Sequence, residues 1–279
     1  MSINSGKAII NACKKLGYNV QGFDGFNESI LDQKFDFIFL ALHGTFGEDG
    51  SIQKILEQNN IKYNGSNSTS SYHCFDKNFT KILAKKNGIL TPKWLLVNSK
   101  EDANISNISF KSIVKPNKEG STIGFSLVED VNNIDIAIDK SLKHGDNSLI
   151  EEYIAGREIT VSILENKSLP VIEIRPHSDI YDYKSKYTKG ESDYICPANL
   201  DDFLSKDIQD IALKVHNLLG CKVYSRVDFR LDKDNKFWLL EINTLPGMTE
   251  TSLFPMAAKA AGLSFQDLIN KIIKLSLEK

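Results

Sequence analysis

The chain has 279 residues, of which 41% are hydrophobic and 25% charged, a composition that is ordinary for a soluble globular protein. Its formal net charge is −2, so the sequence predicts no basic surface for nucleic acid or for an anionic membrane. No apolar run reaches the roughly 18 residues of a membrane span. The four cysteines have no CxxC spacing, which favours reduced cytosolic thiols over a zinc site. This length predicts two or three domains.

The beginning of the chain has the pattern of an α/β unit. Ser5 is placed to cap a helix that ends before Gly17. Phe35–Leu42 is nearly continuous in apolar character, which predicts a strand buried on both faces as in a parallel sheet. The Gly-rich segment His43–Gly50 then leads into a helix expected over Ser51–Gln58. This order predicts a doubly wound first domain with a site at the strand end, although a lone Gly-rich loop is about as often only a tight turn.

A glycine- and hydroxyl-rich loop is predicted in the centre of the chain. A long helix is expected over Ser68–Lys86. A short strand over Ser112–Pro116 then runs into the loop Asn117–Gly124, and a second strand over Phe125–Val128 follows. Backbone N–H groups of such a loop can fold over phosphates, with Lys115 as a point charge at its base. The alternative is a plain hairpin turn, which would not require a lysine beside an apolar strand.

The remaining chain is predicted to alternate helices and strands around one long loop. The expected helices lie over Val131–His144, Leu204–Leu219 and Phe265–Leu277, and the expected strands over Ser148–Ile154, Arg157–Leu164 and Leu169–Arg175, the last two forming a hairpin around Asn166-Lys167. By itself Glu151 is interpreted as a solvated strand end. The segment Tyr181–Tyr194 is polar, aromatic and Lys-rich, which is typical of a lid loop and also of a disordered segment.

Four polar side chains are predicted to meet in a C-terminal hairpin. A hairpin centred between residues 234 and 235 pairs Asp228 with Glu241 and Arg226 with Asn243. All four share one face, because side chains alternate along a strand. Opposed carboxylates repel each other on a solvated sheet face, whereas Mg²⁺ takes oxygen ligands of this kind. From these residues alone, a metal site and the wet face of an amphipathic hairpin both stay open.

Together these segments resemble the D-alanine–D-alanine ligases, members of the ATP-grasp superfamily. The matching motifs are His43-Gly44 with Gly47-Glu48-Asp49-Gly50, Asp76-Lys77, Val114-Lys115-Pro116, Glu119-Gly120-Ser121, Tyr181-Asp182-Tyr183 with Lys186-Tyr187, Arg226-Val227-Asp228, Glu241-Ile242-Asn243-Thr244, Pro246-Gly247-Met248-Thr249 and Ser252-Leu253. The resemblance implies an α/β fold of three domains, with ATP held between two sheets. The expected domains are an N-terminal unit at 1–67, a central unit at 68–151, and a C-terminal unit with the metal and substrate sites at 152–279.

The resemblance also implies a role for single residues. Those expected to bind ATP are Lys77 and Lys115 at the phosphates, Glu151 and Glu158 at the adenine and ribose, and Lys186. Those expected to hold two Mg²⁺ ions, or alternatively Mn²⁺, are Asp228, Glu241 and Asn243. Arg226 would stabilise the oxyanion of a tetrahedral intermediate, and Ser121 and Tyr187 would orient the substrates. The expected substrate-site residues are His43, Gly247, Ser252 and Leu253, with Ser252 at the carboxylate of the second substrate.

The implied reaction joins two D-alanines to D-alanyl-D-alanine for peptidoglycan synthesis. The γ-phosphate passes to the carboxylate of one D-alanine, and the amine of the second then attacks the acyl phosphate. Tyr187 resembles the dipeptide-forming members, which favours D-alanine over D-lactate as the second substrate. The resemblance implies a cytoplasmic homodimer that uses D-alanine and binds neither nucleic acid nor membrane.

One departure concerns the beginning of the sequence. The family begins with a strand, a glycine turn and a glutamate that binds the amine of the first D-alanine. Here Met1–Gly6 resembles the segment that follows this glutamate, and neither Glu28 nor another early acid fits the role. Two alternatives to a D-alanine ligase therefore stay open. One is a truncated homologue that binds nucleotide but is catalytically impaired, and the other is an ATP-grasp ligase with a different second substrate.

Overall fold

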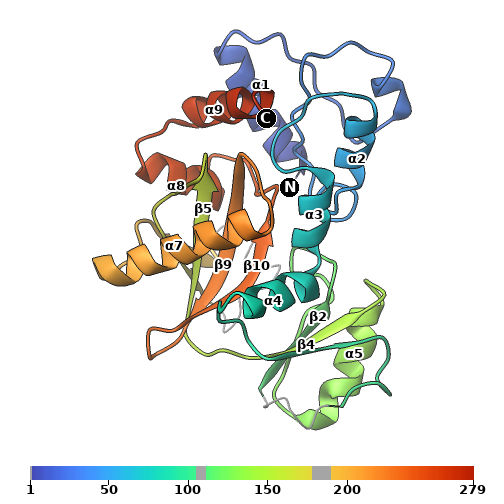
Figure 1. The fold of residues 1–279 in the computed structure, drawn as a ribbon, viewed down its shortest axis with the longest axis vertical. Coiled ribbons are helices and arrows are strands. Elements are labelled where there is room, and N and C mark those ends of the chain that lie inside the picture. The colour runs from blue at the N-terminus through green and yellow to red at the C-terminus, as the bar shows by residue number, and fades with distance from the viewer. Residues whose placement is uncertain (1, 105–110, 178–189) are drawn as a thin grey trace.

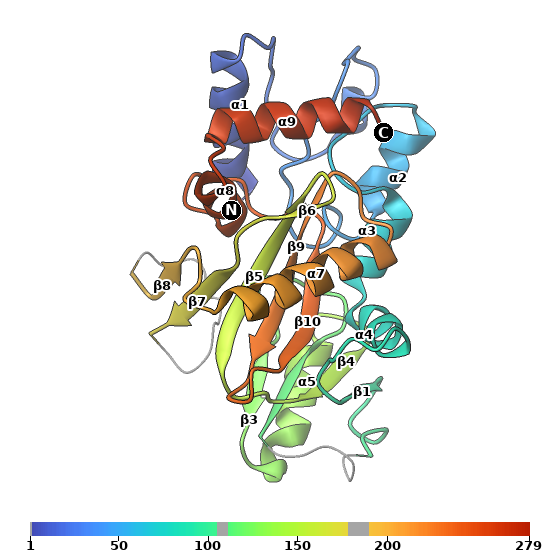
Figure 2. The same cartoon turned by 60° about the vertical axis from the view of Figure 1, so that its left-hand side comes forward.

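The computed structural model describes residues 2–104, 111–177 and 190–279. Its helices are α1 (Ser2–Lys15), α2 (Ser51–Gln58), α3 (Ser68–Phe75), α4 (Lys77–Lys86), α5 (Ile134–Leu142), α7 (Asp202–Leu218), α8 (Leu253–Ala260) and α9 (Phe265–Leu277), with short 3-10 turns at η1 (Glu28–Ile30) and η3 (Val131–Asn133). Its strands are β1 (Trp94–Val97), β2 (Ser112–Pro116), β3 (Ser126–Val128), β4 (Ser148–Glu152), β5 (Arg157–Leu164), β6 (Lys167–Ser168), β7 (Ile172–Pro176), β8 (Ser192–Ile195), β9 (Tyr224–Leu231) and β10 (Phe237–Asn243). These strands form two sheets, one below the other in the views of Figures 1 and 2.

The smaller sheet has the strand order β1-β4-β2-β3, with every neighbouring pair antiparallel. Its two faces differ because side chains alternate along each strand. Val114 and Ile150 are fully buried and pack with Ile138 of α5 in one apolar cluster. Lys115 and Glu151, the next residues along β2 and β4, therefore lie on the opposite face. The sheet thus presents charged groups on the side away from α5.

The larger sheet has the order β10-β9-β5-β7-β8, again antiparallel, and β6 pairs with β5. One face is apolar, and its fully buried residues Val161, Val227 and Phe229 share a cluster with Ile208 and Ala212 of α7. Figure 2 shows α7 lying across this sheet. Since α7 covers the apolar face, the polar residues of β5, β9 and β10 are directed to the other side, where the candidate site lies.

A third cluster joins the two ends of the chain. Ile9 of α1 and Leu56 of α2 pack in the same core as Ile269 of α9, and α1 contacts α9 directly. Tyr224 at the start of β9 is also buried there, and its hydroxyl accepts a hydrogen bond from Asn64 Nδ2 at 2.5 Å. The segment 2–67 therefore shares its core with the C-terminal helices instead of closing on itself.

The strand predicted over Phe35–Leu42 is wrong in extent. The structure has a single parallel bridge there, between Ile38 and Tyr63, and most of the segment is only half-buried. Beyond the bridge, the backbone of Leu40 is hydrogen-bonded to the side chain of Asn64 and not to a neighbouring strand. Leu40 N–H donates to Asn64 Oδ1 at 2.5 Å, and Asn64 Nδ2 donates to Leu40 O at 3.1 Å. Apolar character predicts burial but does not supply a partner strand. No doubly wound sheet is present in the described part of residues 2–67.

The helix predicted over Ser68–Lys86 is two helices, because Asp76 interrupts it. Asp76 has extended backbone angles (φ −83°, ψ 98°), ends α3 and caps α4 by accepting from Phe79 N–H. Asn117 holds the break from the smaller sheet, since its side-chain amide donates to Asp76 Oδ1 at 3.0 Å and its carbonyl oxygen accepts from Lys77 N–H. As a consequence, Lys77 stands at the first position of α4.

Other boundaries are close to the predictions, with three differences. Ser5 lies inside α1 and not at its cap, because its buried hydroxyl accepts from Met248 N–H at 3.3 Å. The β5–β6 turn is at Glu165-Asn166, one residue earlier than predicted, and both residues have positive φ. The lid predicted over Tyr181–Tyr194 ends inside β8, and residues 178–189 lie outside the described chain. Within the described ranges, every helix is too short or too polar to traverse a bilayer.

Candidate active site

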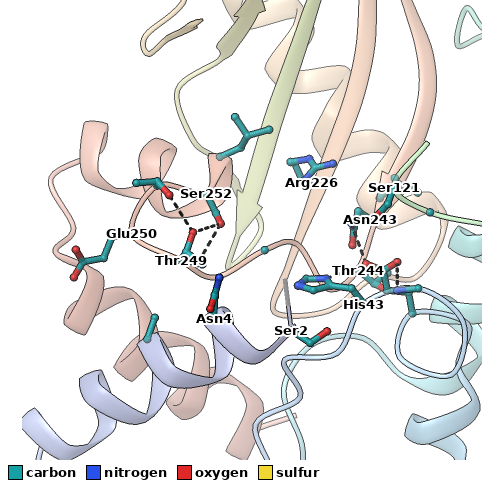
Figure 3. A pocket seen from close by; sticks show the side chains of 18 of the residues that line it. Ser2, Asn4, His43, Ser121, Arg226, Asn243, Thr244, Thr249, Glu250 and Ser252 are labelled. Carbon is teal, nitrogen blue, oxygen red and sulfur yellow. Dashed lines mark hydrogen bonds and ion pairs between the residues drawn. The ribbon is translucent and has the colours of Figure 1, made fainter. Parts of the chain in front are cut away.

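A cavity of about 1100 Å³ lies where α1, α4, α8, the larger sheet, the loop between β2 and β3 and the loop after residue 42 come together (Figure 3). The predicted site residues that line it are His43, Lys77, Ser121, Arg226, Glu241, Asn243, Gly247, Ser252 and Leu253. Four more, Lys115, Glu151, Glu158 and Asp228, are not on its lining. Lys186 and Tyr187 lie outside the described residues. Most of the residues that the sequence selected are thus brought to one cavity.

The C-terminal hairpin confirms the predicted pairing, for a reason that the sequence did not reveal. Asp228 lies opposite Glu241, and Arg226 opposite Asn243. Nearer the turn, however, the pairing is offset by one residue, and a bulge between Leu239 and Glu241 restores it. If the strand continued without this bulge, Leu240 would lie opposite Asp228 and Glu241 would point to the apolar face, since a one-residue slip reverses every side chain. The bulge therefore places this carboxylate in the cavity.

Asp228 is held from two sides. Arg226 grips both of its oxygen atoms, Nε at 2.9 Å from Oδ1 and Nη2 at 2.7 Å from Oδ2. Thr160, opposite Asp228 on β5, donates to Oδ1 at 2.5 Å. Two parallel charge-assisted hydrogen bonds of this kind fix both partners. Oδ2 accepts only from Arg226 among these contacts, so a lone pair on this oxygen is left for a cation.

Glu241 and Asn243 complete the predicted metal-ligand set. Lys77 Nζ lies 3.5 Å from Glu241 Oε2 and donates to Glu119 O at 2.6 Å. Asn243 Oδ1 accepts from Leu245 N–H at 2.8 Å, which leaves a second lone pair on this oxygen. Among the described residues, no three His, Cys, Asp or Glu side chains converge, and the predicted set has only two carboxylates. Two carboxylates and an amide oxygen suit Mg²⁺, which completes its shell with water and substrate phosphates.

Glu48 is a site residue to which the sequence analysis gave no role of its own. Its Oε2 accepts from Gly44 N–H at 3.0 Å, and its Oε1 lies 3.3 Å from Asn243 Nδ2 and 3.5 Å from His43 Nδ1. A Cβ on Gly120 would lie 3.2 Å from Oε2, so the loop after β2 approaches closely. The available signal was an acid at the end of a Gly-rich loop. Glu48 links this loop to β10.

The loop between β2 and β3 is more than a plain turn. Its residues Ser121 and Thr122 have positive φ of 55° and 62°, which is uncommon for residues with a side chain. Gly124 also has positive φ, and a Cβ there would lie 2.8 Å from Pro116. Successive backbone N–H groups in such conformations form concavities that bind anions. This geometry favours the phosphate-binding interpretation over the simple hairpin.

The interpretation of Glu151 as a solvated strand end is wrong. Its side chain is 2% exposed, and its Oε2 lies 3.1 Å from Lys81 Nζ and 3.2 Å from Lys115 Nζ. Burial raises the pKa of Glu151, but Lys115 and Lys81 outweigh it, so the pKa lies below its usual value. Lys81 was missed, although it lies one helical turn after Lys77. Glu158 pairs instead with Arg230 at 3.3 Å on β9.

The start of α8 forms the other end of the cavity. Ser252 precedes the helix but caps it with no side-chain hydrogen bond. Its Oγ instead accepts from Thr249 N–H at 3.1 Å and lies 2.7 Å from Thr249 Oγ1. In Figure 3 these hydroxyls lie near Asn4 of α1. The N–H groups at the start of α8 thus remain for an anion, for which a helix N-terminus is suited.

Comparisons with known proteins decide the family. The model described as "D-ala D-ala ligase N-terminus" matches residues 14–66, and the one described as "D-ala D-ala ligase C-terminus" matches residues 83–274. The chain belongs to the D-alanine–D-alanine ligase family. The family predicted from the sequence motifs is therefore confirmed.

Curated and solved D-alanine–D-alanine ligases support this over nearly the whole chain. The ligase of Methylacidiphilum infernorum (isolate V4) is 44% identical over 277 residues, covering 99% of this chain and 90% of the relative. The crystal structure of the Bacillus anthracis ligase complexed with ATP has 35% identity and a TM-score of 0.88, over 99% of this chain and 92% of that one. The predicted ATP-grasp fold is confirmed by this likeness.

A ligase named for a different second substrate also matches. The VanG D-Ala:D-Ser ligase of Enterococcus faecalis is 33% identical with a TM-score of 0.79, over 88% of this chain and 74% of that one. Solved members of this fold are thus named for different second substrates. The likeness in fold alone therefore does not identify the second substrate.

Proposed function

We propose that this protein ligates two D-alanines to D-alanyl-D-alanine at the expense of ATP, for peptidoglycan synthesis. The observation that carries the proposal is the convergence of three parts on one cavity. These parts are the loop with successive positive-φ residues, the polar face of β9 and β10, and the start of α8. They suit, in this order, phosphates, divalent cations and a substrate carboxylate.

ATP is proposed to lie with its phosphates under the loop between β2 and β3. Lys77 at the start of α4 and Lys115 on β2 are the proposed phosphate ligands, and Glu151 and Glu158 are assigned to the adenine and ribose. Support comes from the Bacillus anthracis relative, which was solved in complex with ATP. Lys186, outside the described residues, is also proposed to bind the nucleotide.

Asp228, Glu241 and Asn243 are proposed to hold two Mg²⁺ ions, which Mn²⁺ can replace. Their support is the shared face of β9 and β10. The ions would neutralise charge on the transferring phosphoryl group. Arg226 stands beside this set on the same face of the hairpin, and its guanidinium is proposed to stabilise the oxyanion of the tetrahedral intermediate.

The reaction proceeds by activation of a carboxylate. The first D-alanine accepts the γ-phosphoryl group on a carboxylate oxygen, and ADP leaves. The amine of the second D-alanine attacks the acyl carbon, and phosphate leaves as the peptide bond forms. Ser252, with Gly247 and Leu253, is assigned to the carboxylate end of the second substrate, while His43 and Ser121 orient the first. Tyr187, which lies outside the described residues, is proposed to orient the substrates together with Ser121.

Three further features belong to the proposal. The protein acts in the cytoplasm, where ATP is available, and it forms a homodimer, which light scattering would test. The chain is proposed to divide at 67/68 and 151/152, the second boundary one residue before the end of β4 at Glu152. The three apolar clusters support three units, although the first also includes α8 and α9.

The test is D-alanine-dependent formation of ADP, with the product identified by mass spectrometry. The proposal expects D-alanyl-D-alanine from ATP, Mg²⁺ and D-alanine. D-Serine and D-lactate, each offered with D-alanine, test the second candidate, which the likeness to the D-Ala:D-Ser ligase favours. A mixed product in preference to the dipeptide would reassign the second substrate. Binding of ATP without any product would instead indicate a nucleotide-binding homologue with impaired catalysis.

A further inference from the structure

The buried Lys81 is a charged group that the proposed reaction does not use. It lies on α4, four residues after Lys77, yet its side chain is 0% exposed. Its ammonium donates to Thr91 Oγ1 at 2.7 Å and to Pro92 O at 3.4 Å. Thr91 in turn donates to Leu239 O at 2.8 Å, so this contact reaches β10. Lys81 is therefore fixed between α4, the smaller sheet and the larger one.

Lys81 shares one carboxylate oxygen with a second lysine. Glu151 Oε2 lies 3.1 Å from Lys81 Nζ and 3.2 Å from Lys115 Nζ. The cluster thus holds two cations and one anion at the same place. The two lysines differ in exposure, with 14% of the Lys115 side chain exposed and none of that of Lys81.

The two cations therefore have different freedom. Lys115 stands at the base of the loop between β2 and β3 and can turn toward a phosphate, whereas Lys81 cannot reach solvent. If Lys81 were absent, each approach of Lys115 to a phosphate would leave Glu151 as an unpaired buried carboxylate. Such a group costs several kcal/mol or takes up a proton. With Lys81 present, Glu151 keeps a counter-ion while Lys115 moves.

We propose that Lys81 is a positioning residue, the permanent counter-ion that keeps Glu151 ionised and so releases Lys115 to bind the nucleotide. The inference rests on the nucleotide roles proposed above for Lys115 and Glu151. The charged groups that act on the cluster are Lys81 from α4, Lys115 from β2 and, at longer range, Glu241 from β10. Burial lowers the pKa of Lys81 to about 8 despite Glu151, so the counter-ion is charged at neutral pH.

The test is the Kd of ATP, measured by calorimetry on the whole protein with Mg²⁺ and without D-alanine, so that no turnover occurs. Lys81→Met removes the charge at similar length and is expected to raise the Kd at least about tenfold. The matched control is Lys85→Met, the same change one turn later on the exposed side of α4, which leaves the Kd unchanged. Circular dichroism and a melting curve establish that both variants fold.

A second background separates a counter-ion from a packing group. Glu151→Gln replaces the carboxylate with a neutral amide that needs no counter-ion. Adding Lys81→Met to this variant is therefore expected to cause little further loss of ATP affinity. This double variant also lacks the unpaired charge and is expected to fold. An equal loss from Lys81→Met in both backgrounds would overturn the proposal, because it would mean that Lys81 acts only by filling space.

The pH dependence gives a readout that a packing role would not move. Glu151 in Lys81→Met has a single counter-ion, so its pKa rises, and the Kd ratio of variant to wild type should grow as the pH falls. Above pH 8 the ratio should shrink, since wild-type Lys81 loses its own charge there. A ratio independent of pH counts against the proposal. Wild type that does not bind ATP refutes the proposed function itself, whereas wild-type affinity in Lys81→Met refutes only the role of Lys81.

Discussion

Glu241 is the carboxylate whose loss should affect catalysis with the least effect on folding. Its side chain is 30% exposed, and its ion pair with Lys77 is long, at 3.5 Å. Glu241→Gln keeps the shape but removes the negative charge that a divalent cation requires. We expect D-alanine-dependent ADP formation to fall by more than the roughly 10- to 100-fold that loss of an outer-shell metal partner causes.

The control for this prediction is Glu129→Gln, the same change at an exposed carboxylate that forms an ion pair with Lys111. It should retain the activity of the wild type. ADP formed at the wild-type rate by Glu241→Gln would show that the metal-ligand assignment is wrong.

His216 should make the folded protein sensitive to acid. It is 1% exposed, its Nδ1 lies 2.7 Å from Ser225 Oγ, and burial lowers its pKa to about 4. Between pH 6.5 and about 4 the unfolded chain binds a proton here and the folded chain does not, so stability falls as the pH falls. We expect a loss of about 2 kcal/mol between pH 7.5 and pH 5.

Urea denaturation of wild type and His216→Asn at these two pH values checks the sensitivity. The variant lacks the titrating group, so its free energy of unfolding should fall by about 2 kcal/mol less over the same interval. Parallel losses in both proteins would mean that other groups cause the acid sensitivity.

The side chains that the sequence did not reveal are those whose function depends on contacts from distant segments. Glu48 contacts Asn243, 195 residues later, and Lys81 contacts Glu151, 70 positions further along the chain. No local pattern distinguishes such residues from solvated ones. Asp228 and Glu241 were accessible because one hairpin brings them together, and strand alternation is enough to place them on one face.

At the scale of the elements, the break between α3 and α4 should matter for nucleotide binding. Asp76 caps α4 and contacts Asn117 and Lys118 in the loop between β2 and β3. Asp76→Ala should lower stability by about 1 kcal/mol through loss of the cap. Because Lys77 follows directly, we also expect the KM for ATP to rise by about tenfold, equivalent to about 1.4 kcal/mol.

Asp201→Ala provides the matched comparison. Asp201 caps α7 by the same contact, accepting from Leu204 N–H at 2.8 Å, on an exposed part of the chain. Steady-state kinetics and thermal melting of the two variants should give similar losses of stability and a raised KM only for Asp76→Ala. A raised KM in both would assign the effect to general destabilisation.

Elements were predictable where local pattern and tertiary partner agreed. The helices over Ser51–Gln58 and Phe265–Leu277 have the predicted bounds, since their apolar periodicity faces the core that they join. Phe35–Leu42 failed because strand pairing needs a neighbour that composition does not specify. The bulge at Leu240 was not predicted. The strands are offset by one residue from the predicted register near the turn, and the bulge brings Glu241 back to the predicted position opposite Asp228.

At the scale of the whole molecule, the core shared by both ends predicts coupled opening. Ile269 of α9 is fully buried in the cluster that includes Ile9 of α1. Ile269→Ala should cost about 2–5 kcal/mol and should raise hydrogen exchange in α1 as well as in α9. The comparison is Ile138→Ala, a fully buried isoleucine of α5 in the separate cluster of the smaller sheet.

Hydrogen exchange followed by mass spectrometry distinguishes the two cases. Ile138→Ala should increase exchange in α5 and leave α1 protected. If Ile269→Ala left α1 fully protected, the two ends of the chain would not form one cooperative unit. The sequence predicted three domains as continuous segments. It did not predict that residues of α1 and α9, at opposite ends of the chain, share one core.

The side-chain amide of Asn64 bonds the backbone of Leu40 as a neighbouring strand would, and this affects how Asn64 deamidates. Asn64 precedes Gly65, and an asparagine before glycine deamidates when the glycine nitrogen attacks the side-chain carbonyl carbon. Here that amide is buried and held by Leu40 and Tyr224, so it cannot turn toward the nitrogen. Deamidation therefore proceeds from unfolded molecules, and its product places a carboxylate against Leu40 O, where an amide had donated. Each molecule that unfolds long enough to react loses the contact that would hold residue 64 on refolding, so storage damage accumulates at this position.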